Sequence, residues 1–324
     1  MSGEPDAAPA AAPRHAVLLA LGSRGDVDPL CSFGHALAAA GWRVTVATEA
    51  RLQPVVASCG LKGFTIASED VEMLFDPPSL AALQKGNPGL SFLRVSRKWQ
   101  KEHENREAVM ASYIRACADA TVVICGPLSA CPAFCVAEVC GGCNDTRLAA
   151  HFPRIPFQAK GLPLVIVNLQ PMMPTALFPC IMFPPSPLLS RFACYNTATY
   201  RILQRTYYAD QKRATDSLRV TLGLAPLTRP AGVLDELPRL PNVVILNLFS
   251  SLLFPTVCGG VPPADYLPSV MGGFVLPPQL KDPPKLPPGL DEFLDAQPPG
   301  GRTVCIGFGA FCVRCSGLFN DTKP

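Results

Sequence analysis

The fold is decided by residues 16–48, AVLLALGSRGDVDPLCSFGHALAAAGWRVTVAT. This stretch begins with an apolar run of strand length, Ala16–Leu21, which ends in the glycine-rich turn of residues 22–26. Helix-forming residues follow over Leu30–Ala40, and the β-branched segment Arg43–Thr48 has the composition of a second strand. Two strands joined by a crossover helix lie parallel in one sheet, so the opening of the chain predicts a β-α-β unit.

The same alternation continues along the chain. Further short apolar runs predict strands at Phe64–Ile66, Thr121–Cys125, Leu164–Asn168 and Val243–Asn247. Helical patterns lie between them, at Glu49–Ser58, Arg97–Ala118 and Cys131–Cys140. Continuously apolar strands are buried on both faces, which requires helices on each side of a parallel sheet. The predicted fold class is therefore α/β, with a doubly wound parallel sheet.

Composition narrows the class of protein. Of 324 residues, 48% are hydrophobic and 16% are charged, which supports a globular core and excludes an intrinsically disordered chain. The net charge of +3 gives no reason to expect nucleic acid as a partner. The 14 cysteines are too small a share for a disulfide scaffold, and acidic Glu4 and Asp6 stand where a secretion signal is basic. We therefore expect a cytoplasmic protein with mostly buried, reduced thiols.

Proline is abundant, at 36 of 324 residues, and it is clustered. Seven prolines interrupt the uncharged stretch 161–190, so we expect no transmembrane helix there. Six more lie in 277–288, a composition typical of a semi-rigid linker. Proline therefore marks one loop and one domain boundary in a folded chain.

The boundary at the linker predicts the domain organisation. A disordered arm covers residues 1–15, a first domain covers 16–276, and the linker covers 277–289. Residues 290–324 then begin a second α/β domain, with a strand and glycine turn at 302–309, RTVCIGFG. Because these last 35 residues are fewer than a domain needs, we expect the second domain to be begun and not completed.

The turn Gly22–Pro29 (GSRGDVDP) is the first candidate site. Ligands bind at the carboxyl ends of strands in open parallel sheets, and glycines let the backbone approach a ligand closely. Asp26 is a candidate general base that takes a proton from a hydroxyl group. The spacing is equally compatible with Asp26 or Asp28 capping the following helix. A nicotinamide-dependent oxidoreductase is set aside, because Gly22 and Gly25 lack a third glycine in register.

The second candidate site is the apolar, proline-broken loop after the predicted strand Leu164–Asn168. Prolines make such a loop rigid, and methionine and phenylalanine supply adaptable apolar surface that suits a pocket for a lipophilic acceptor. Ordinary core packing beneath a long loop explains the same pattern, and both interpretations stay open. The residues singled out are Gln170, Met172, Met173, Thr175 and Phe178.

Three other patterns carry less weight. The C-x-x-C pairs at 140–143 and 312–315 lie too far apart for a familiar zinc site, so no metal is expected. The tripeptide Arg24-Gly25-Asp26 suits cell adhesion only in an extracellular loop, which nothing else supports. The basic cluster 94–101 around Trp99 suits an anionic membrane surface, but three glutamates follow at once and favour a solvated helix face. Peripheral membrane contact therefore stays open.

Taken together, these motifs resemble the N-terminal domain of sterol 3β-glucosyltransferases and of related bacterial antibiotic glycosyltransferases. The similarity covers roughly residues 16–309, and the opening segment 19–48 is its most specific part. It continues through Ala137-Glu138, Asn168–Pro179, Phe249-Ser250, Gly273-Phe274, Leu290–Leu294 and Ile306–Gly309.

The resemblance implies a GT-B architecture, in which two Rossmann-like domains face each other across a cleft. It implies that Asp26 is the base that activates the acceptor hydroxyl, while Ser23 and Arg24 shape the same loop. Residues 170–178 would line the acceptor pocket. The expected function is a UDP-sugar-dependent hexosyltransferase acting on a sterol or similar lipid hydroxyl, with glucose as the expected sugar.

The donor half departs from the family pattern. The resemblance assigns Gly307 and Gly309 to the UDP-sugar, which is a co-substrate, and it implies no cofactor. However, Ala310 stands where the family usually carries serine, the donor-domain nucleotide signature is missing, and 141–161 is an insertion. We therefore expect this chain to carry mainly the acceptor half. A non-catalytic acceptor-binding or lipid-binding module, or an inactive truncated product, is the alternative.

Overall fold

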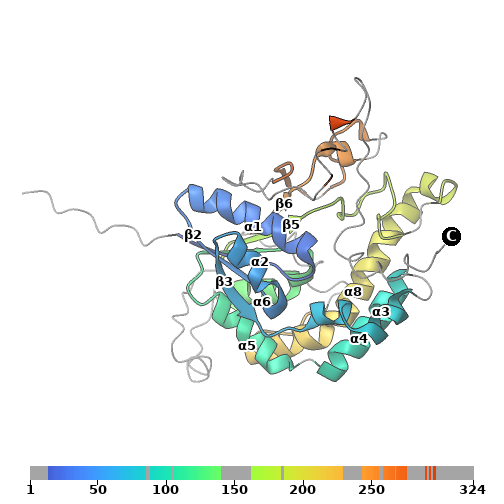
Figure 1. Ribbon diagram of the computed structural model, residues 1–324. Coiled ribbons are helices and arrows are strands. Elements are labelled where there is room, and N and C mark those ends of the chain that lie inside the picture. The colour runs from blue at the N-terminus through green and yellow to red at the C-terminus, as the bar shows by residue number, and fades with distance from the viewer. Residues whose placement is uncertain are drawn as a thin grey trace, which may run out of the picture. The chain divides into compact units, whose positions relative to one another are not determined.

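The computed structural model describes residues 14–275, with gaps at 85–87, 104, 140–161, 184–185, 229–242, 255–257 and 267, and beyond them residues 289, 292, 295 and 296. The N-terminal arm to residue 13, the insertion 141–161, both C-x-x-C pairs, Gly307 and Gly309 lie outside the described residues. The chain divides into two compact units, 1–275 and 276–324, and the first holds the elements described below (Figure 1).

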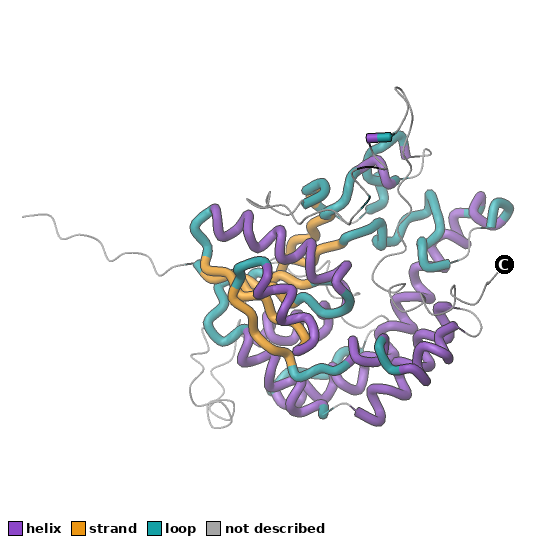
Figure 2. Tube along the Cα trace, in the orientation of Figure 1, coloured by secondary structure: helices purple, strands orange, loops and turns teal. Residues whose placement is uncertain are grey.

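A single sheet of seven parallel strands forms the centre of the first unit, in the order β3-β2-β1-β4-β5-β6-β7 (Figure 2). The chain starts in the middle, builds one edge through β2 and β3, and then crosses back past β1 to build the other. This is the strand order of Rossmann-like domains, so the predicted α/β class with a parallel sheet is confirmed. The strands are β1 His15–Leu19, β2 Arg43–Glu49, β3 Lys62–Ile66, β4 Val122–Cys125, β5 Leu164–Asn168, β6 Val243–Asn247 and β7 Val270–Met271.

Helices cover both faces of this sheet (Figure 2). On β1, Val17 and Leu19 belong to a core layer shared with α5, α6 and α8, whereas Ala16 and Leu18 belong to a layer shared with α1 and α2. The strand pleat, which alternates side chains between the two faces, produces this division. The helices are α1 Arg24–Ala39, α2 Gln53–Ser58, α3 Pro77–Gln84, α4 Pro88–His103, α5 Arg106–Ala116, α6 Ala130–Val139 and α8 Ala193–Thr221.

The helix expected over Glu49–Ser58 begins at Gln53, because Glu49 is the last residue of β2. Two other predicted helix boundaries are also wrong. The first helix begins at Arg24 and not at Leu30, because Ser23 caps it and Pro29 is accommodated inside it. The segment expected as one helix over 97–118 is two helices, since the side chain of Asn105 accepts a hydrogen bond from the Ala108 backbone N–H and starts a new one. In both places a side-chain cap decides the boundary.

The 29-residue helix α8 was not expected from the sequence. It is tied to α6 by Arg219, whose guanidinium donates to both carboxylate oxygens of Glu138 at 2.7 and 3.3 Å. Arg219 is buried and also donates to the Ala225 carbonyl at 2.6 Å. This pairing satisfies a buried charge and fixes the late helix against the first half of the domain.

The described part of the chain contains nine free cysteines, seven of them buried. Burial raises the pKa of Cys131 and of Cys135 to about 12, so both thiols stay protonated at neutral pH. Among the same residues, no helix combines the length and the apolar character needed to cross a bilayer.

A buried carboxyl group lies at the end of β2. Glu49 is 1% exposed, and its Oε2 accepts a hydrogen bond from the Val71 backbone N–H at 2.8 Å, while Oε1 has no hydrogen-bond partner. Burial, with the nearby charges of Asp70 and Glu72, raises the pKa of Glu49 to about 7. Between about pH 4.5 and 7, the folded protein therefore holds a proton on Glu49 that the unfolded chain releases.

We expect Glu49→Gln to stabilise the protein at alkaline pH. The stability that Glu49 contributes is complete below its unfolded pKa, near 4.5, and is lost as pH rises to about 7. Glutamine keeps an acceptor for Val71 and does not titrate, so the free energy of unfolding should exceed that of wild type by roughly 1–3 kcal/mol above pH 7. Urea unfolding across pH measures this, with exposed Glu102→Gln as control. Parallel pH profiles for Glu49→Gln and wild type would contradict it.

Candidate functional site at the end of strand β1

The carboxyl end of β1 is locked to both neighbouring strands. The Leu19 carbonyl accepts hydrogen bonds from the Gly126 backbone N–H at 3.3 Å and from the Ser129 hydroxyl at 3.1 Å, both just beyond β4. The Ala20 carbonyl accepts one from the Thr48 hydroxyl at 2.6 Å, in β2. The strand order reverses at this point, which is where open α/β sheets form a ligand-binding crevice.

Gly22 makes the turn out of the sheet. Its φ of +118° is a conformation that side chains with a Cβ rarely adopt. A Cβ at this position would also collide with the carboxyl group of Asp26 and lie 2.9 Å from Leu128 Cδ1. The missing side chain therefore lets Asp26, from α1, and Leu128, from the loop after β4, approach the same backbone position.

Asp26 and Ser23 form a reciprocal cap at the start of α1. Asp26 Oδ2 accepts from the Ser23 backbone N–H at 2.8 Å and from the Ser23 hydroxyl at 3.1 Å, and Ser23 Oγ accepts from the Gly25 N–H at 3.2 Å. The capping interpretation of Asp26 thus describes the geometry. The cap uses only Oδ2 of the Asp26 carboxylate, because Oδ1 has no hydrogen bond to any described residue. Asp28 pairs instead with exposed Arg24, at 3.3 Å.

The surroundings of Asp26 raise its affinity for a proton. Burial raises the pKa of Asp26 above the usual range, and the two hydrogen bonds from Ser23 offset this only in part. A general base benefits from such a raised pKa, because it then binds an accepted proton more strongly than an exposed aspartate does. The site can therefore accept a proton from a hydroxyl group that reaches Oδ1.

A cleft adjoins this turn through Leu21 and Leu128. Its walls come from segments that are far apart in the sequence, namely the end of β1, the residues after β3, α5 and α8. Tyr207 on α8 holds the wall in place, since its hydroxyl is 2.9 Å from the Leu128 carbonyl and 3.3 Å from that of Pro127. The other lining residues include Ser68, Asp70, Met110, Tyr113, Gln211, Thr215 and Leu218.

The sequence motifs identified the turn but not the cleft. Ser23, Arg24 and Asp26 lie together, as adjacent residues must. The α5 and α8 residues that line the cleft stand in ordinary helical patterns, and they reach it only through the tertiary fold. No local signal in the sequence marks them.

The apolar loop after β5 lies two strands away from β1, about 10 Å along the sheet. Gln170 is exposed and Met172 is half-buried, whereas Met173, Thr175 and Phe178 are buried. Phe178 belongs to a third core cluster, which contains Phe249 and Phe254. The Thr175 hydroxyl donates to Asp265 at 2.7 Å. Core packing accounts for the three buried side chains, and a binding role for this loop stays a prediction.

Residues 16–140 match the model of the glycosyltransferase family 28 N-terminal domain. Sterol 3-beta-glucosyltransferase of Pichia angusta is 26% identical over 298 residues, which is 91% of this chain and 21% of that protein. The Debaryomyces hansenii sterol 3-beta-glucosyltransferase is 26% identical over 306 residues, 92% of this chain and 16% of that protein. The family model and these relatives confirm the expected resemblance to the N-terminal domain of sterol 3-beta-glucosyltransferases.

The chain spans about a fifth of the length of the curated relatives it matches. Among solved structures, the kitacinnamycin glycotransferase has a TM-score of 0.41 and 16% identity, over 77% of this chain and 49% of that one. The calicheamicin glycosyltransferase has a TM-score of 0.39 and 16% identity, over 76% of this chain and 50% of that one.

We expect Gly22→Ala to destabilise the protein more than Gly41→Ala does. Both glycines have positive φ, but a Cβ at Gly41 meets nothing within 4 Å. Gly41→Ala should therefore cost only the backbone strain, about 1–2 kcal/mol. Gly22→Ala adds the displacement of Asp26 and Leu128, for a total of roughly 2–5 kcal/mol. Chemical denaturation of both variants measures the difference, and equal losses would show that the turn is not tightly packed.

Proposed function

We propose that this chain provides the acceptor-binding half of a UDP-sugar-dependent glycosyltransferase, and that Asp26 accepts the proton of the acceptor hydroxyl. The proposed acceptor is a sterol or a similar lipid alcohol, and the proposed sugar is glucose. The observation that carries this proposal is the position of Asp26. Its carboxyl group is half-buried at the reversal of strand order, with Oδ2 held by Ser23 and Oδ1 open.

In the proposed reaction, the acceptor hydroxyl lies against Asp26 Oδ1. As its oxygen bonds to the anomeric carbon, the hydroxyl proton passes to the carboxylate, and the bond from that carbon to the UDP oxygen breaks with its electron pair on UDP. Ser23 keeps the carboxylate in one orientation, which reduces the entropy lost in reaching the transition state. Burial keeps the proton affinity of Asp26 high enough to receive the proton.

The cleft beside the turn has an open volume of about 40 Å³, so in this proposal it takes only the hydroxyl-bearing end of a lipophilic acceptor. Leu21, Met110 and Leu218 supply apolar wall, and polar groups such as Ser68 and Thr215 can orient the hydroxyl group. In this proposal Gln170 and Met172 extend the same acceptor surface from the loop after β5. Met173, Thr175 and Phe178 act by holding that loop, and Arg24 acts by shaping the turn.

The sugar donor belongs to the other half of the proposed enzyme. The match with sterol 3-beta-glucosyltransferases supports UDP-glucose as the donor. Gly307 and Gly309 are proposed as its contacts, on the basis of the resemblance to that family.

Asp26→Asn tests the base. Asparagine keeps the size of the side chain and an oxygen that accepts from Ser23, but it has little affinity for a proton. With the chain joined to the donor domain of a sterol 3-beta-glucosyltransferase and supplied with UDP-glucose and ergosterol, we expect transfer to fall by at least 100-fold. Binding of a fluorescent sterol should stay within about twofold, because the cleft is unchanged. Asp28→Asn, which changes the charge of the same helix turn, should leave both quantities within about twofold.

The outcomes separate the parts of the proposal. Equal transfer rates for wild type and Asp26→Asn would remove Asp26 as the base. Sterol binding without any transfer by the chain joined to that donor domain would reject the transferase in favour of a lipid-binding module. Failure to bind sterol would reject the acceptor assignment.

A further inference from the structure

Exposed apolar side chains are numerous between residues 177 and 202. Of the fifteen large hydrophobic side chains that are exposed in the described part of the chain, seven lie between residues 177 and 202. Leu188, Phe192 and Ile202 are 66%, 54% and 53% exposed. Scattered single residues of this kind are normal on a surface, whereas a cluster points to a partner.

Three of them, Leu188, Leu189 and Phe192, immediately precede α8, and Ile202 lies on it. The 3₁₀ turn Leu189–Arg191 leads directly into the helix, and Asn196 Nδ2 fastens the two by donating to the Ser190 carbonyl at 3.0 Å. From Phe192 to Arg205 the helix rises about 20 Å. Figure 1 shows this N-terminal end of α8 extending away from the sheet, whereas its other end lies beside α5.

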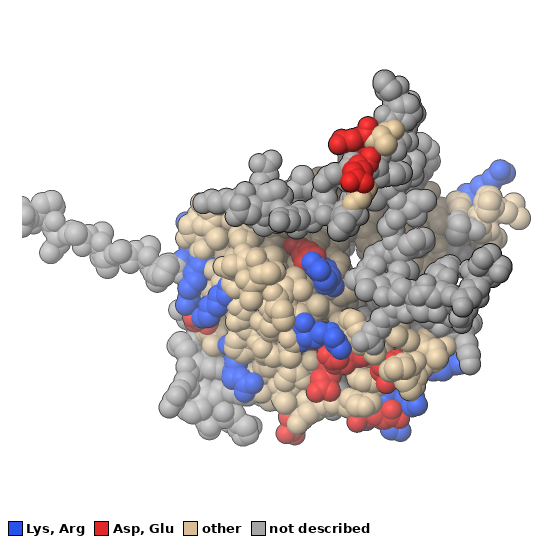
Figure 3. All heavy atoms as spheres, in the orientation of Figure 1, with Lys and Arg blue, Asp and Glu red and all other residues tan. Residues whose placement is uncertain are grey.

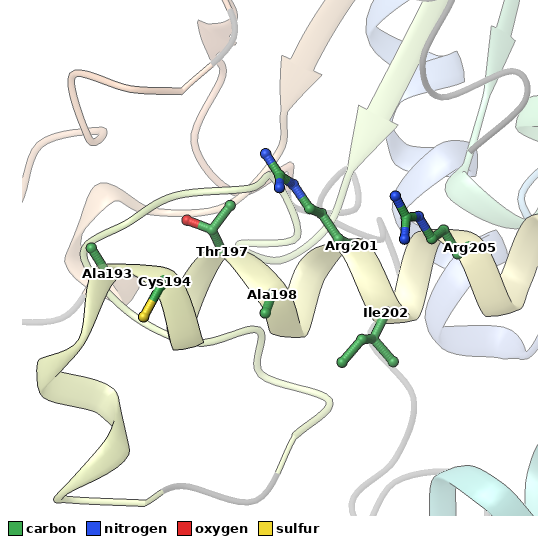
Figure 4. A pocket seen from close by; sticks show the side chains of 7 residues that line it. All are labelled: Ala193, Cys194, Thr197, Ala198, Arg201, Ile202 and Arg205. Atoms are coloured by element: carbon green, nitrogen blue, oxygen red, sulfur yellow. The ribbon is translucent and has the colours of Figure 1, made fainter. Parts of the chain in front are cut away.

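Arginines accompany the apolar side chains. Arg201 and Arg205 lie one turn apart and point to one side of α8, while Ile202 points to the other, and all three line a shallow hollow along the helix (Figure 4). Arg191 lies in the preceding turn. We call the six residues Leu188, Arg191, Phe192, Arg201, Ile202 and Arg205 the docking face.

The docking face is cationic, and its arginines form no ion pair within the described part of the chain. No aspartate or glutamate occurs in the sequence between Asp145 and Asp210. None of the three arginines forms an ion pair with a described residue, whereas Lys212, further along the helix, pairs with Asp216 at 2.6 Å. Acidic and basic side chains are interspersed over the part of the surface in Figure 3.

One acidic residue does reach the neighbouring loop. Asp265 accepts hydrogen bonds from the Thr175 hydroxyl and from the Ala176 backbone N–H, at 2.7 and 2.6 Å. These bonds lower the pKa of Asp265 against the effect of burial, so it remains negative. Its oxygens are occupied within the fold and do not pair with the arginines.

We propose that the docking face binds the surface of an anionic lipid bilayer. The arginines contact lipid phosphates, while Leu188, Phe192 and Ile202 enter the boundary between headgroups and acyl chains. Interfacial helices combine cationic and apolar side chains in this way. A soluble polyanion such as RNA would use the charges but leave the aliphatic side chains in water, and a bilayer takes both. This inference does not depend on sugar transfer.

The basic cluster around Trp99 is a weaker membrane site. The Trp99 indole N–H donates to the Glu69 carbonyl at 2.9 Å, and its ring stacks on His103 with centroids 4.0 Å apart. The aromatic side chain that would anchor such a cluster is therefore engaged within the protein.

Vesicle sedimentation with the full chain tests the proposal. We expect binding to phosphatidylcholine vesicles that contain phosphatidylserine, and at least tenfold weaker binding to vesicles of phosphatidylcholine alone. Arg201→Gln with Arg205→Gln should weaken binding by about tenfold to thirtyfold, since each cation near an anionic surface contributes about fivefold. Phe192→Ser with Ile202→Ser should weaken it by about tenfold or more.

Matched variants on the same helix control for charge and hydrophobicity. Lys212→Gln removes an exposed cation outside the docking face, and Val220→Ser removes a valine that is 73% exposed near the far end of α8. Both should bind as wild type does. Equal binding to the two kinds of vesicle would overturn the proposal. Weaker vesicle binding by the double arginine variant, together with unchanged binding by the variant with Phe192→Ser and Ile202→Ser, would also overturn it. That result indicates a soluble anion or an acidic protein as the partner.

Discussion

The rest of the structure depends on the pairing of β1 with β2 on one edge and β4 on the other. Both edges of β1 are hydrogen-bonded, and the side chains of Ala16–Leu19 are fully buried between two helical layers. The chain that leaves β1 therefore cannot continue in the sheet or shift its register without breaking one of these layers. It must turn sharply, and Gly22 makes this turn. Its positive φ disfavours any residue with a side chain, and a Cβ there would also collide with Asp26 and Leu128.

The residues directly after this turn form the candidate site. Ser23 caps α1, Asp26 completes the cap, and the reversal of strand order opens the crevice beside them. Later segments then complete the walls. Tyr207 binds the loop that carries Leu128, and Arg219 ties the same helix to α6 through Glu138. A helix that lies almost 200 residues after β1 thus helps to fix the geometry around Asp26.

The strands, helices and site residues that could be predicted from the sequence are those that local interactions determine. Central strands such as Leu164–Asn168 are buried on both faces, so their apolar runs are continuous and easy to recognise. The start of α1 was misplaced because Pro29 resembles a boundary, although Ser23 had already capped the helix. Asp26 was identified because glycines and a preceding strand surround it. The α8 wall could not be predicted, since contacts such as that of Tyr207 with Leu128 join residues 79 positions apart.

The proposals for Asp26 and for α8 meet in one physical argument. A lipid alcohol is scarce in water and concentrated in bilayers, so an enzyme for it gains from lying on the membrane surface. The docking face occupies the first turns of α8, and Gln211, Thr215 and Leu218 of the same helix line the cleft beside Asp26. From Ile202 to Thr215 the helix rises about 20 Å. Because Arg219 pairs with Glu138 of α6 and Tyr207 bonds to the loop after β4, α8 is fixed against the rest of the domain, and a bilayer bound at one end would lie at a fixed distance from the cleft at the other. A rigid helix of this length would therefore set how far an acceptor must rise from the lipid to reach the carboxylate.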